Sequence, residues 1–271
     1  MKRFITFLII SFIAGSGVVS AVPAEAAVIR ITQPKIELDL GRGERYSGEL
    51  EVENPTDEAF QVRIYLEDWK YKGNGTGEKD FGPAGTMPHS ASKWITFAPA
   101  DAGLGPFSRQ AVRYTVAVPE DAAGGNYSVL FFENTIGEAA DPTQEGARVR
   151  VASRLGALFF IHIRGSTLHQ GEVVSAKVSP PAGNAPLEIE TTFKNSGNVD
   201  ITLGGNLLIM DAEGKVVGGG DLAKIYTFPG EVETRVTQWV GRLPKGAYDL
   251  LLTYDMGQGQ AIVKEEKINL V

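Results

Sequence analysis

Apolar residues recur at every second position through most of this chain, and this spacing constrains the fold more than any other feature. Successive side chains of a β-strand point to opposite faces, so a period of two predicts strands with one buried face. After residue 26 no window shows a convincing helical apolar stripe, and the best helix candidate is a short turn over 119–123. The 32 glycines and 14 prolines favour many tight turns. An all-β fold is predicted, with its clearest strands at 60–67, 187–194, 232–240 and 248–254.

The two halves of the chain follow one plan. A strand ends in a polar turn at 54–57 and another at 195–198, and a later apolar strand opens with Tyr127 in the first half and Tyr248 in the second. Each tyrosine follows a glycine by two residues, as in the tyrosine corner of immunoglobulin-like sandwiches, where the hydroxyl bonds back to upstream backbone. We expect two tandem immunoglobulin-like β-sandwich domains. Their boundaries fall at 27–165 for the first domain, 166–170 for a linker and 171–271 for the second.

The N-terminus has the three regions of a secretory signal peptide. Lys2 and Arg3 are followed by an apolar run over 4–13, and Ala24-Glu25-Ala26 offers a cleavage site between small residues. The apolar run is shorter than the ~20 helical residues that span a bilayer. We expect cleavage after about Ala26 and export to the periplasm or the exterior, with no transmembrane anchor left. A secreted chain without cysteine fits a bacterial envelope.

Composition and the histidines argue against several functions. With 26 Lys and Arg against 33 Asp and Glu, the chain is acidic, which disfavours nucleic-acid binding through phosphate contacts. Cysteine is absent, and none of His89, His162 and His169 has a second histidine at metal-ligand spacing, so we expect no metal and no cofactor. Gly218–Gly220 lack the lysine of a phosphate loop and indicate a hairpin bend. The carboxylates are scattered and no strained nucleophile turn is present, so we expect no catalytic residues. An accessory hydrolase is kept as a third hypothesis.

The segment 148–164 is the most informative part of the sequence. It is about three times the usual strand length of ~5–6 residues, and its second half is apolar on both faces. Either the second face packs on the neighbouring domain or on a strand that crosses between sheets, or the segment is an edge that accepts an extended segment of another protein by β-augmentation. An insertion at 72–92 predicts an exposed Gly-rich loop, and 137–146 is a polar break between strands.

Five stretches of the first half form a recognisable pattern: 50–55, 94–99, 107–113, 118–133 and 154–160. Behind a signal peptide and in two immunoglobulin-like domains, they resemble the periplasmic pilus-assembly chaperones of the PapD type. In that family the long last strand of the first domain donates alternating apolar side chains to an incomplete subunit. The resemblance therefore implies partner contacts from Leu155, Ala157, Phe159 and Ile161.

The same family holds the terminal carboxylate of the subunit with a basic pair in the cleft between the domains. One member belongs to the first strand, where this chain reads Thr32-Gln33-Pro34-Lys35 without an arginine. The other belongs near Ala157, where Arg154 is the candidate. The resemblance implies a non-enzymatic, exported, chaperone-like protein. Its partner is expected to be another envelope or surface-appendage protein, similar to a pilus subunit, bound at the edge of the first domain.

A second likeness leads to an alternative. Gly124-Gly125 before an apolar strand and the Gly-rich loop before Trp94 resemble the cell-wall proteins that accompany WxL surface proteins, whose first domain binds peptidoglycan. Exposed aromatic rings near such a loop suit sugar stacking, so Trp69, Tyr71 and Trp94 are candidate glycan contacts, with packing in the core or loop as the other interpretation. The alternative function is an envelope module that binds peptidoglycan, another glycan or a surface protein.

Overall fold

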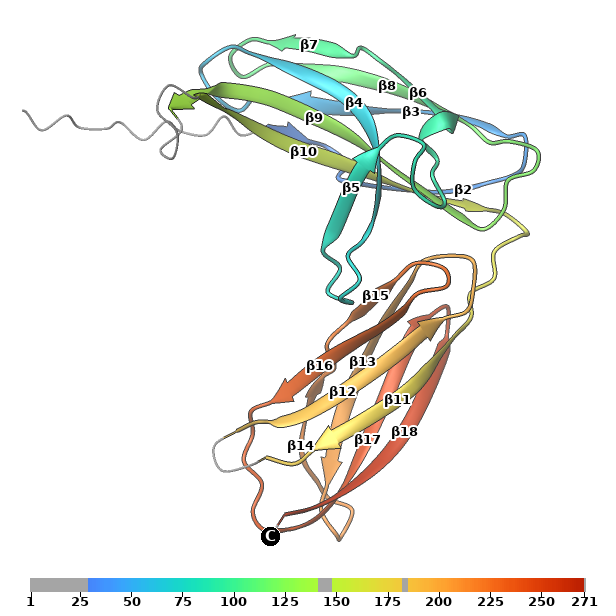
Figure 1. Cartoon of the computed structure of the whole chain (residues 1–271), viewed down its shortest axis with the longest axis vertical. Coiled ribbons are helices and arrows are strands. Elements are labelled where there is room, and N and C mark those ends of the chain that lie inside the picture. The colour runs from blue at the N-terminus through green and yellow to red at the C-terminus, as the bar shows by residue number, and fades with distance from the viewer. Residues whose placement is uncertain (1–28, 141–147, 182–184, 271) are drawn as a thin grey trace, which may run out of the picture.

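The computed structural model describes residues 29–140, 148–181 and 185–270, and the cartoon shows two bodies of strands joined at one side (Figure 1). The predicted signal peptide and its cleavage site after Ala26 lie outside the described residues. Among those residues, two sheets come from strands between Arg30 and Ile163 and two from strands between Gly171 and Leu270. The predicted all-β class with two sandwich domains is confirmed. The domain limits at 165 and 171 stay a prediction.

The first sandwich is made of ten strands in the described part of the chain. They are Arg30–Ile31 (β1), Lys35–Leu40 (β2), Arg45–Glu53 (β3), Phe60–Tyr71 (β4), Lys79–Pro83 (β5), Ile95–Ala98 (β6), Asp101–Leu104 (β7), Arg109–Ala117 (β8), Gly125–Ala140 (β9) and Arg148–Ile163 (β10). One sheet has the order β1–β3–β8–β6, and the other β2–β10–β9–β4–β5 with β7 beside β4. The β2–β10 pair is parallel, whereas β9 is antiparallel to both β10 and β4.

The second sandwich is made of eight strands in the described part of the chain. They are Gly171–Ser179 (β11), Leu187–Asn195 (β12), Ile201–Met210 (β13), Val216–Asp221 (β14), Ile225–Thr227 (β15), Val232–Trp239 (β16), Gly246–Gly257 (β17) and Gln260–Leu270 (β18). One sheet has the order β11–β12–β16, and the other β14–β13–β17–β18 with β15 beside β13. All these pairs are antiparallel.

Each sandwich has its own apolar core, built from the alternate residues that the sequence pattern singles out. Val62 and Ile64 of β4 are buried in the first core, and Leu250 and Leu252 of β17 in the second. A third cluster, which we call the aromatic joint, contains residues of both sandwiches. Its members are Trp69, Tyr71, Tyr127, Val129, Phe131 and Phe160 from the first sandwich and Phe228 from the second.

Residues 119–123, the best helix candidate of the sequence, form a turn, and the one helix among the described residues is a 3-10 turn at Ser92–Trp94. Two other local predictions are wrong. The predicted loop at 72–92 contains β5, and β9 runs through 137–140 of the predicted break. The rest of that break, 141–146, lies outside the described residues. In both places pairing with a long neighbouring strand extends the sheet into sequence that has no alternating pattern of its own.

The glycines of 218–220 lie inside β14 and do not form the predicted hairpin bend. The indole of Trp239 on β16 lies across this strand and donates its Nε1–H to Gly219 O at 3.1 Å. A Cβ atom on Gly218 would come within 2.7 Å of that ring. The glycines therefore make room for a tryptophan that bridges the edges of two sheets.

Asp68, at the end of β4, fixes the segment that follows β5. Its carboxylate is buried and accepts hydrogen bonds from the main-chain N–H of Thr86 at 2.7 Å and of Met87 at 2.9 Å, and from the hydroxyls of Ser90 and Ser92. Burial by itself raises the pKa of Asp68, but these hydrogen bonds outweigh it and hold the pKa below its ordinary value. The ionised carboxylate of Asp68 thus holds residues 86–92 in place through hydrogen bonds.

Candidate functional site

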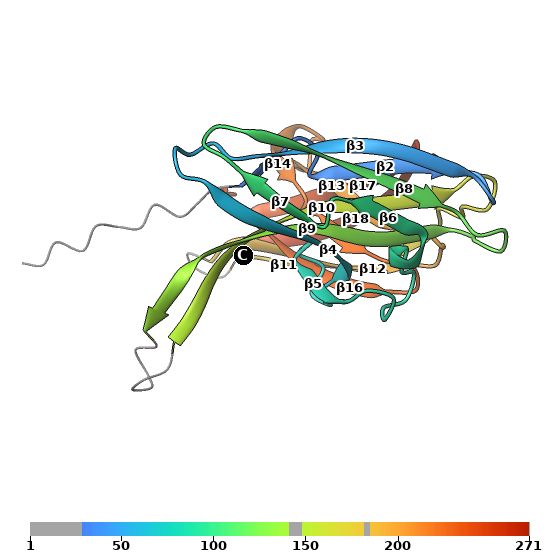
Figure 2. The ribbon, with the colours of Figure 1, turned by 90° about the horizontal axis from the view of Figure 1, so that it is seen from above.

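Only part of one side of β10 is covered by a neighbouring strand. On that side β2 pairs with 158–163, and Pro34 O accepts the N–H of the first of these residues at 3.0 Å. Within the described chain, the preceding residues of β10 pair with β9 alone. Main-chain groups of a strand face its two sides alternately, so the N–H and C=O groups of Arg154 and Gly156 face the uncovered side. We call this side, at residues 152–157, the free edge. The hairpin of β9 and β10 also projects beyond the rest of the first sandwich (Figure 2).

The apolar side chains predicted to contact a partner are not at this edge. Ala157, Phe159 and Ile161 are fully buried in the first core, and Leu155 is half-buried. The ring of Phe159 packs edge-on against Tyr114, with centroids 5.1 Å apart. These residues share the face of β10 that closes the sandwich, so a partner cannot reach the three buried ones without opening the core. This corrects the expectation for them: what a partner can reach here is main chain.

Arg154 is predicted to meet a partner and is folded onto its own sheet. Its guanidinium lies over Phe131, 4.0 Å from the ring centroid, and pairs with Glu67 at 3.3 Å. The side chain belongs to the outer face of the sheet, opposite the core face of Phe159. In the free protein the Arg154 side chain therefore already contacts Phe131 and Glu67.

The aromatic joint explains why β9 and β10 are apolar on both faces. Phe228 of the second sandwich stacks on Tyr127, with centroids 4.2 Å apart and an interplanar angle of 18°, and packs on Trp69. Phe160 of β10 packs on the same two rings. Phe228 of the other domain thus covers the outer face of β9 at Tyr127, whereas Phe81 of β5 packs on Phe131 of the same face. The first of the two explanations offered for the doubly apolar strand, packing on the neighbouring domain, is confirmed.

The candidate glycan contacts are part of these packed regions. Trp69 is 1% exposed and donates its Nε1–H to Ser128 O at 3.0 Å, and Tyr71 is 6% exposed. Trp94 is half-buried against the first core. The structure does not bring the three rings together on a surface. Trp69 and Tyr71 are therefore unavailable for sugar stacking in this arrangement of the domains.

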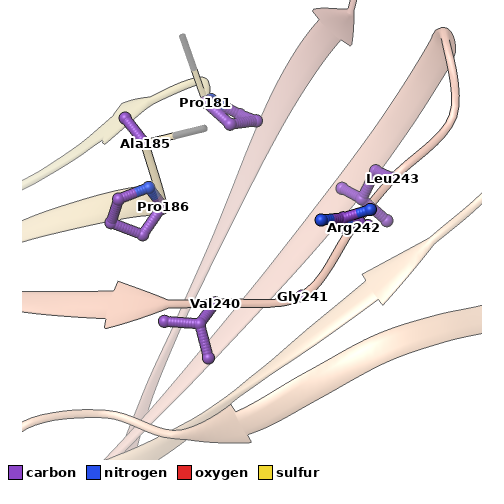
Figure 3. A pocket seen from close by; sticks show the side chains of 7 residues that line it. All are labelled: Pro181, Ala185, Pro186, Val240, Gly241, Arg242 and Leu243. Atoms are coloured by element: carbon purple, nitrogen blue, oxygen red, sulfur yellow. The ribbon is translucent and has the colours of Figure 1, made fainter. Parts of the chain in front are cut away.

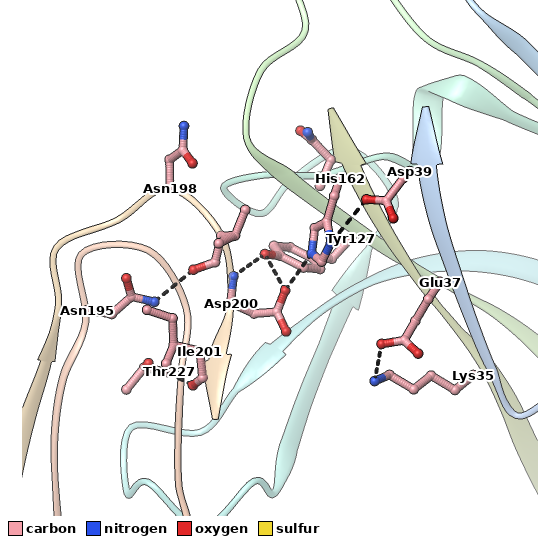
Figure 4. A network of polar contacts seen from close by, with 12 residues as sticks. Lys35, Glu37, Asp39, Tyr127, His162, Asn195, Asn198, Asp200, Ile201 and Thr227 are labelled. Carbon is pink, nitrogen blue, oxygen red and sulfur yellow. Dashed lines mark hydrogen bonds and ion pairs between the residues drawn. The ribbon is translucent and has the colours of Figure 1, made fainter. Parts of the chain in front are cut away.

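A polar network at the edge of the aromatic joint connects the two domains (Figure 4). The Tyr127 hydroxyl donates to Asp200 Oδ1 at 3.0 Å and accepts the N–H of Asp200 at 2.7 Å. His162 Nε2 lies 2.9 Å from the same carboxylate oxygen, and His162 Nδ1 lies 3.9 Å from Asp39. The second domain's Asp200 is thus held by side chains of β9 and β10.

The ionisable groups of this network are perturbed by it. The hydrogen bond to Asp200 raises the pKa of His162 above its ordinary value, and attraction to Asp200, Asp39 and Glu37 adds to this, while burial opposes it. Burial raises the pKa of Tyr127, and the nearby Asp200 carboxylate raises it further. The arrangement favours a protonated histidine beside an ionised aspartate, which is an ion pair across the domain boundary.

A cleft of about 270 Å³ opens between the domains beside this network. Two ammonium groups line it. Lys35 Nζ lies 4.5 Å from the ring centroid of Phe160 and 2.5 Å from Glu37, and Lys79 Nζ donates to Gly77 O at 3.3 Å. The other lining residues are Tyr71, Thr76, Gly77, Leu158, Phe160, Asp200, Thr202 and Tyr226. The cleft lies at the end of β2, where the free edge of β10 also begins.

A larger cavity of about 610 Å³ lies in the second domain, where the chain enters β12 and leaves β16 (Figure 3). Arg242 is the charged side chain among its lining residues. In the described part of the chain, no group of three or more His, Cys, Asp or Glu side chains could hold a metal ion. No helix within 29–140, 148–181 and 185–270 is long and apolar enough to cross a membrane.

The chain is similar in fold to pilus-assembly chaperones. A chain of the Salmonella enterica complex of SafA pilin with the SafB chaperone is 13% identical, with a TM-score of 0.42 over 91% of this chain and 98% of that chain. A chain of the Acinetobacter baumannii CsuC–CsuE pre-assembly complex is 15% identical, with a TM-score of 0.43 over 90% and 98%. The Pseudomonas aeruginosa CupB2 chaperone is 11% identical, with a TM-score of 0.39 over 88% and 100%. No family model and no curated protein matches the chain. At this distance we draw no functional conclusion from the likeness.

Sequence reasoning missed several residues of the site. Asp200, Tyr226 and Phe228 come from the second domain, and Lys79 comes from the insertion that was expected to be a loop. One available signal was the run of aromatic residues on the outer face of β4 and β9, which is too apolar for a face exposed to water. That signal indicates a covered surface but does not say which residues cover it.

Proposed function

We propose that this protein is a non-enzymatic, exported, chaperone-like protein that binds an extended segment of another envelope or surface-appendage protein. The segment adds a strand at the free edge of β10. The main observation behind the proposal is that β2 begins at Lys35. Among the described residues, no strand covers the main chain of Arg154 and Gly156 on this side, directly beside a cleft between two domains. A strand added there would continue the line of β2 and complete the side of β10.

The cleft supports the same proposal. Lys35 and Lys79 place two positive charges where a strand on the free edge would reach the domain boundary. An anionic group, such as the carboxylate at the end of a polypeptide, suits this position because it would form ion pairs with the two ammonium groups. At Lys35 it would take the place of Glu37. In this proposal Lys35 and Lys79 take the role expected of a basic pair, and Arg154 does not.

Main-chain recognition can be separated from side-chain recognition at one position. Arg154→Pro removes the N–H that faces the free edge, whereas proline is tolerated on a strand edge that has no partner. Arg154→Ala removes the same guanidinium and keeps the N–H, so it is the matched control. We expect the proline variant to lose partner capture and the alanine variant to retain most of it.

The measurement is affinity capture with the mature protein from an extract of its native envelope, with bound proteins quantified by mass spectrometry. Hydrogen exchange of the captured complex should show new protection at 152–157. Equal capture by Arg154→Pro and wild type, or a complex without protection at the free edge, contradicts strand addition there. We do not propose glycan binding, because two of its three candidate rings are buried between the domains.

A further inference from the structure

The hairpin between β4 and β5 reaches the second domain. Figure 1 shows it descending from the first sandwich toward β15. At its tip, Gly75 O accepts the main-chain N–H of Tyr226 at 3.2 Å and lies 3.4 Å from Arg235 Nη1. The contact is made by main chain of the hairpin, so it depends on the position of the tip more than on its side chains.

The tip has a defined shape of its own. Asn74 Oδ1 accepts the N–H of Thr76 at 3.1 Å and its hydroxyl at 2.7 Å. Lys72 N–H donates to Glu78 O at 2.8 Å, and the side chains of these two residues form an ion pair. These bonds close the hairpin without help from the second domain, so the tip is already ordered when it docks.

Two glycines permit the close approach. Gly75 has φ 62° and Gly77 has φ 79°, which favour glycine. A Cβ atom on Gly77 would lie 2.7 Å from the Tyr226 ring, and one on Gly75 would lie 3.0 Å from the Arg235 side chain. The spacing between hairpin and second domain is therefore set by the absence of side chains at these positions.

The second domain is attached at another place as well. Near the linker, Asn198 O accepts the N–H of Gly125 at 2.8 Å, and Asn198 Nδ2 donates to Ser166 O at 2.8 Å. These contacts adjoin those of Asp200 with Tyr127 and His162, so together they form one region of attachment next to the linker. The hairpin tip adds a second region of attachment, on β15 and β16. The two attachments come from separate parts of the first sandwich, at 125 and at 72–78.

We infer that the β4–β5 hairpin is an interdomain clasp, which docks its tip on β15 and β16 and fixes the angle between the sandwiches. The clasp also forms one wall of the cleft, through Thr76, Gly77 and Lys79. Release of the tip would change the width of the cleft without unfolding either core. This inference concerns the free protein and holds whether or not a strand binds at β10.

The test is single-molecule energy transfer between one dye on each domain. The chain has no cysteine, so Asp57→Cys and Glu213→Cys, both in exposed turns, give two unique labelling sites. The clasp is broken in two ways: by Gly77→Val, and by replacing 73–77 with a two-residue Asn-Gly turn. Gly73→Ala is the control, because a Cβ atom there is 3.5 Å from Glu233 and in ordinary contact.

We expect one narrow distribution of transfer efficiency for the wild type and for Gly73→Ala. Both clasp variants should give a broader or shifted distribution, with circular dichroism and thermal unfolding showing that the sandwiches remain folded. If the shortened hairpin leaves the distribution unchanged, the inference is overturned. Should Gly77→Val fail to fold, the shortened hairpin alone decides, because it removes the tip and keeps both paired strands.

Discussion

Tyr127 and Tyr248 stand at equivalent places in the two domains and do different things. Each follows a glycine by two residues and lies near the start of a long core-forming strand. Tyr248 donates its hydroxyl to Pro244 O at 2.9 Å, which is the tyrosine corner that the sequence predicts. Tyr127 turns its hydroxyl to Asp200, 73 positions away in the other domain.

The difference follows from what lies beside each ring. Tyr248 is packed within the second core. Tyr127 is 1% exposed and stacked under Phe228 of the other domain, so its hydroxyl needs a partner at the domain boundary. The same local pattern thus produces a local corner in one sandwich and an interdomain contact in the other. In the first domain the tyrosine at the corner position is therefore part of the aromatic joint.

Of the variants that test this difference between the domains, Phe228→Ala is expected to lower the free energy of unfolding most. The change removes a ring that contacts Tyr127, Tyr71 and Trp69. Removal of a buried phenylalanine costs about 3–5 kcal/mol of the free energy of unfolding. Because the lost contacts join two domains, we expect denaturant unfolding to separate into two transitions.

The matched control is Phe193→Ala, since Phe193 is fully buried in the second core and does not belong to the aromatic joint. It should lower the stability of the second domain by a similar amount and leave Tyr127 packed against Phe228. Near-ultraviolet circular dichroism of the aromatic joint distinguishes the two variants. A loss of less than about 1 kcal/mol for Phe228→Ala would show that the joint contributes little to stability.

An intermediate effect is expected from removing each tyrosine hydroxyl. Tyr127→Phe leaves the partly buried N–H of Asp200 without its acceptor and should cost about 1–3 kcal/mol. Tyr248→Phe removes one hydrogen bond and should cost about 0.5–1.5 kcal/mol. Urea unfolding of both variants gives the comparison. Equal losses would mean that the interdomain bond is no stronger than the local corner.

The smallest effect is a pH dependence of the joint. The pKa of His162 is raised in the folded protein, chiefly by its hydrogen bond to Asp200, so folding favours the protonated form. Its stabilisation is therefore fully present below the unfolded pKa of about 6.5 and is lost as the pH rises through the folded pKa. Asp39 and Glu37 also face this histidine, and Tyr127 donates to the same Asp200 oxygen.

The measurement compares the melting temperatures of the wild type and His162→Gln from about pH 5 to about pH 9. Glutamine can donate to Asp200 but carries no charge. We expect the wild type to have an advantage at acidic pH that shrinks as the pH rises. A difference that stays constant across this range would mean that the charge of His162 contributes nothing to the joint.

The fold was accessible to sequence reasoning because its information is local. Alternation at 60–67 and 187–194 places the same residues in the core that the structure buries, and Tyr248 forms the predicted corner. Both features depend on neighbours within a few residues or on the choice between a buried and a solvated face. A chain of alternating strands and tight turns has few other ways to bury its apolar side chains.

The candidate site was accessible only in part. The length of β10 and its doubly apolar half were correctly singled out, but the face of Ala157, Phe159 and Ile161 was assigned to a partner and belongs to the core. Alternation distinguishes two faces of a strand and does not say which one closes the sandwich when both are apolar. The position where β2 begins, which leaves the free edge of β10, depends on pairing between residues more than 100 positions apart.

By itself the sequence determined an all-β chain of two sandwiches, where the long strands lie and which side chains alternate along them. The tertiary structure alone decided that Phe228 covers Tyr127, that Asp200 meets His162, and that the hairpin tip at Gly75 reaches the second domain. The physical reason is the range of the interactions. Strand formation follows from the side-chain period of each segment, whereas a joint between domains forms from whichever surfaces the two finished sandwiches bring into contact.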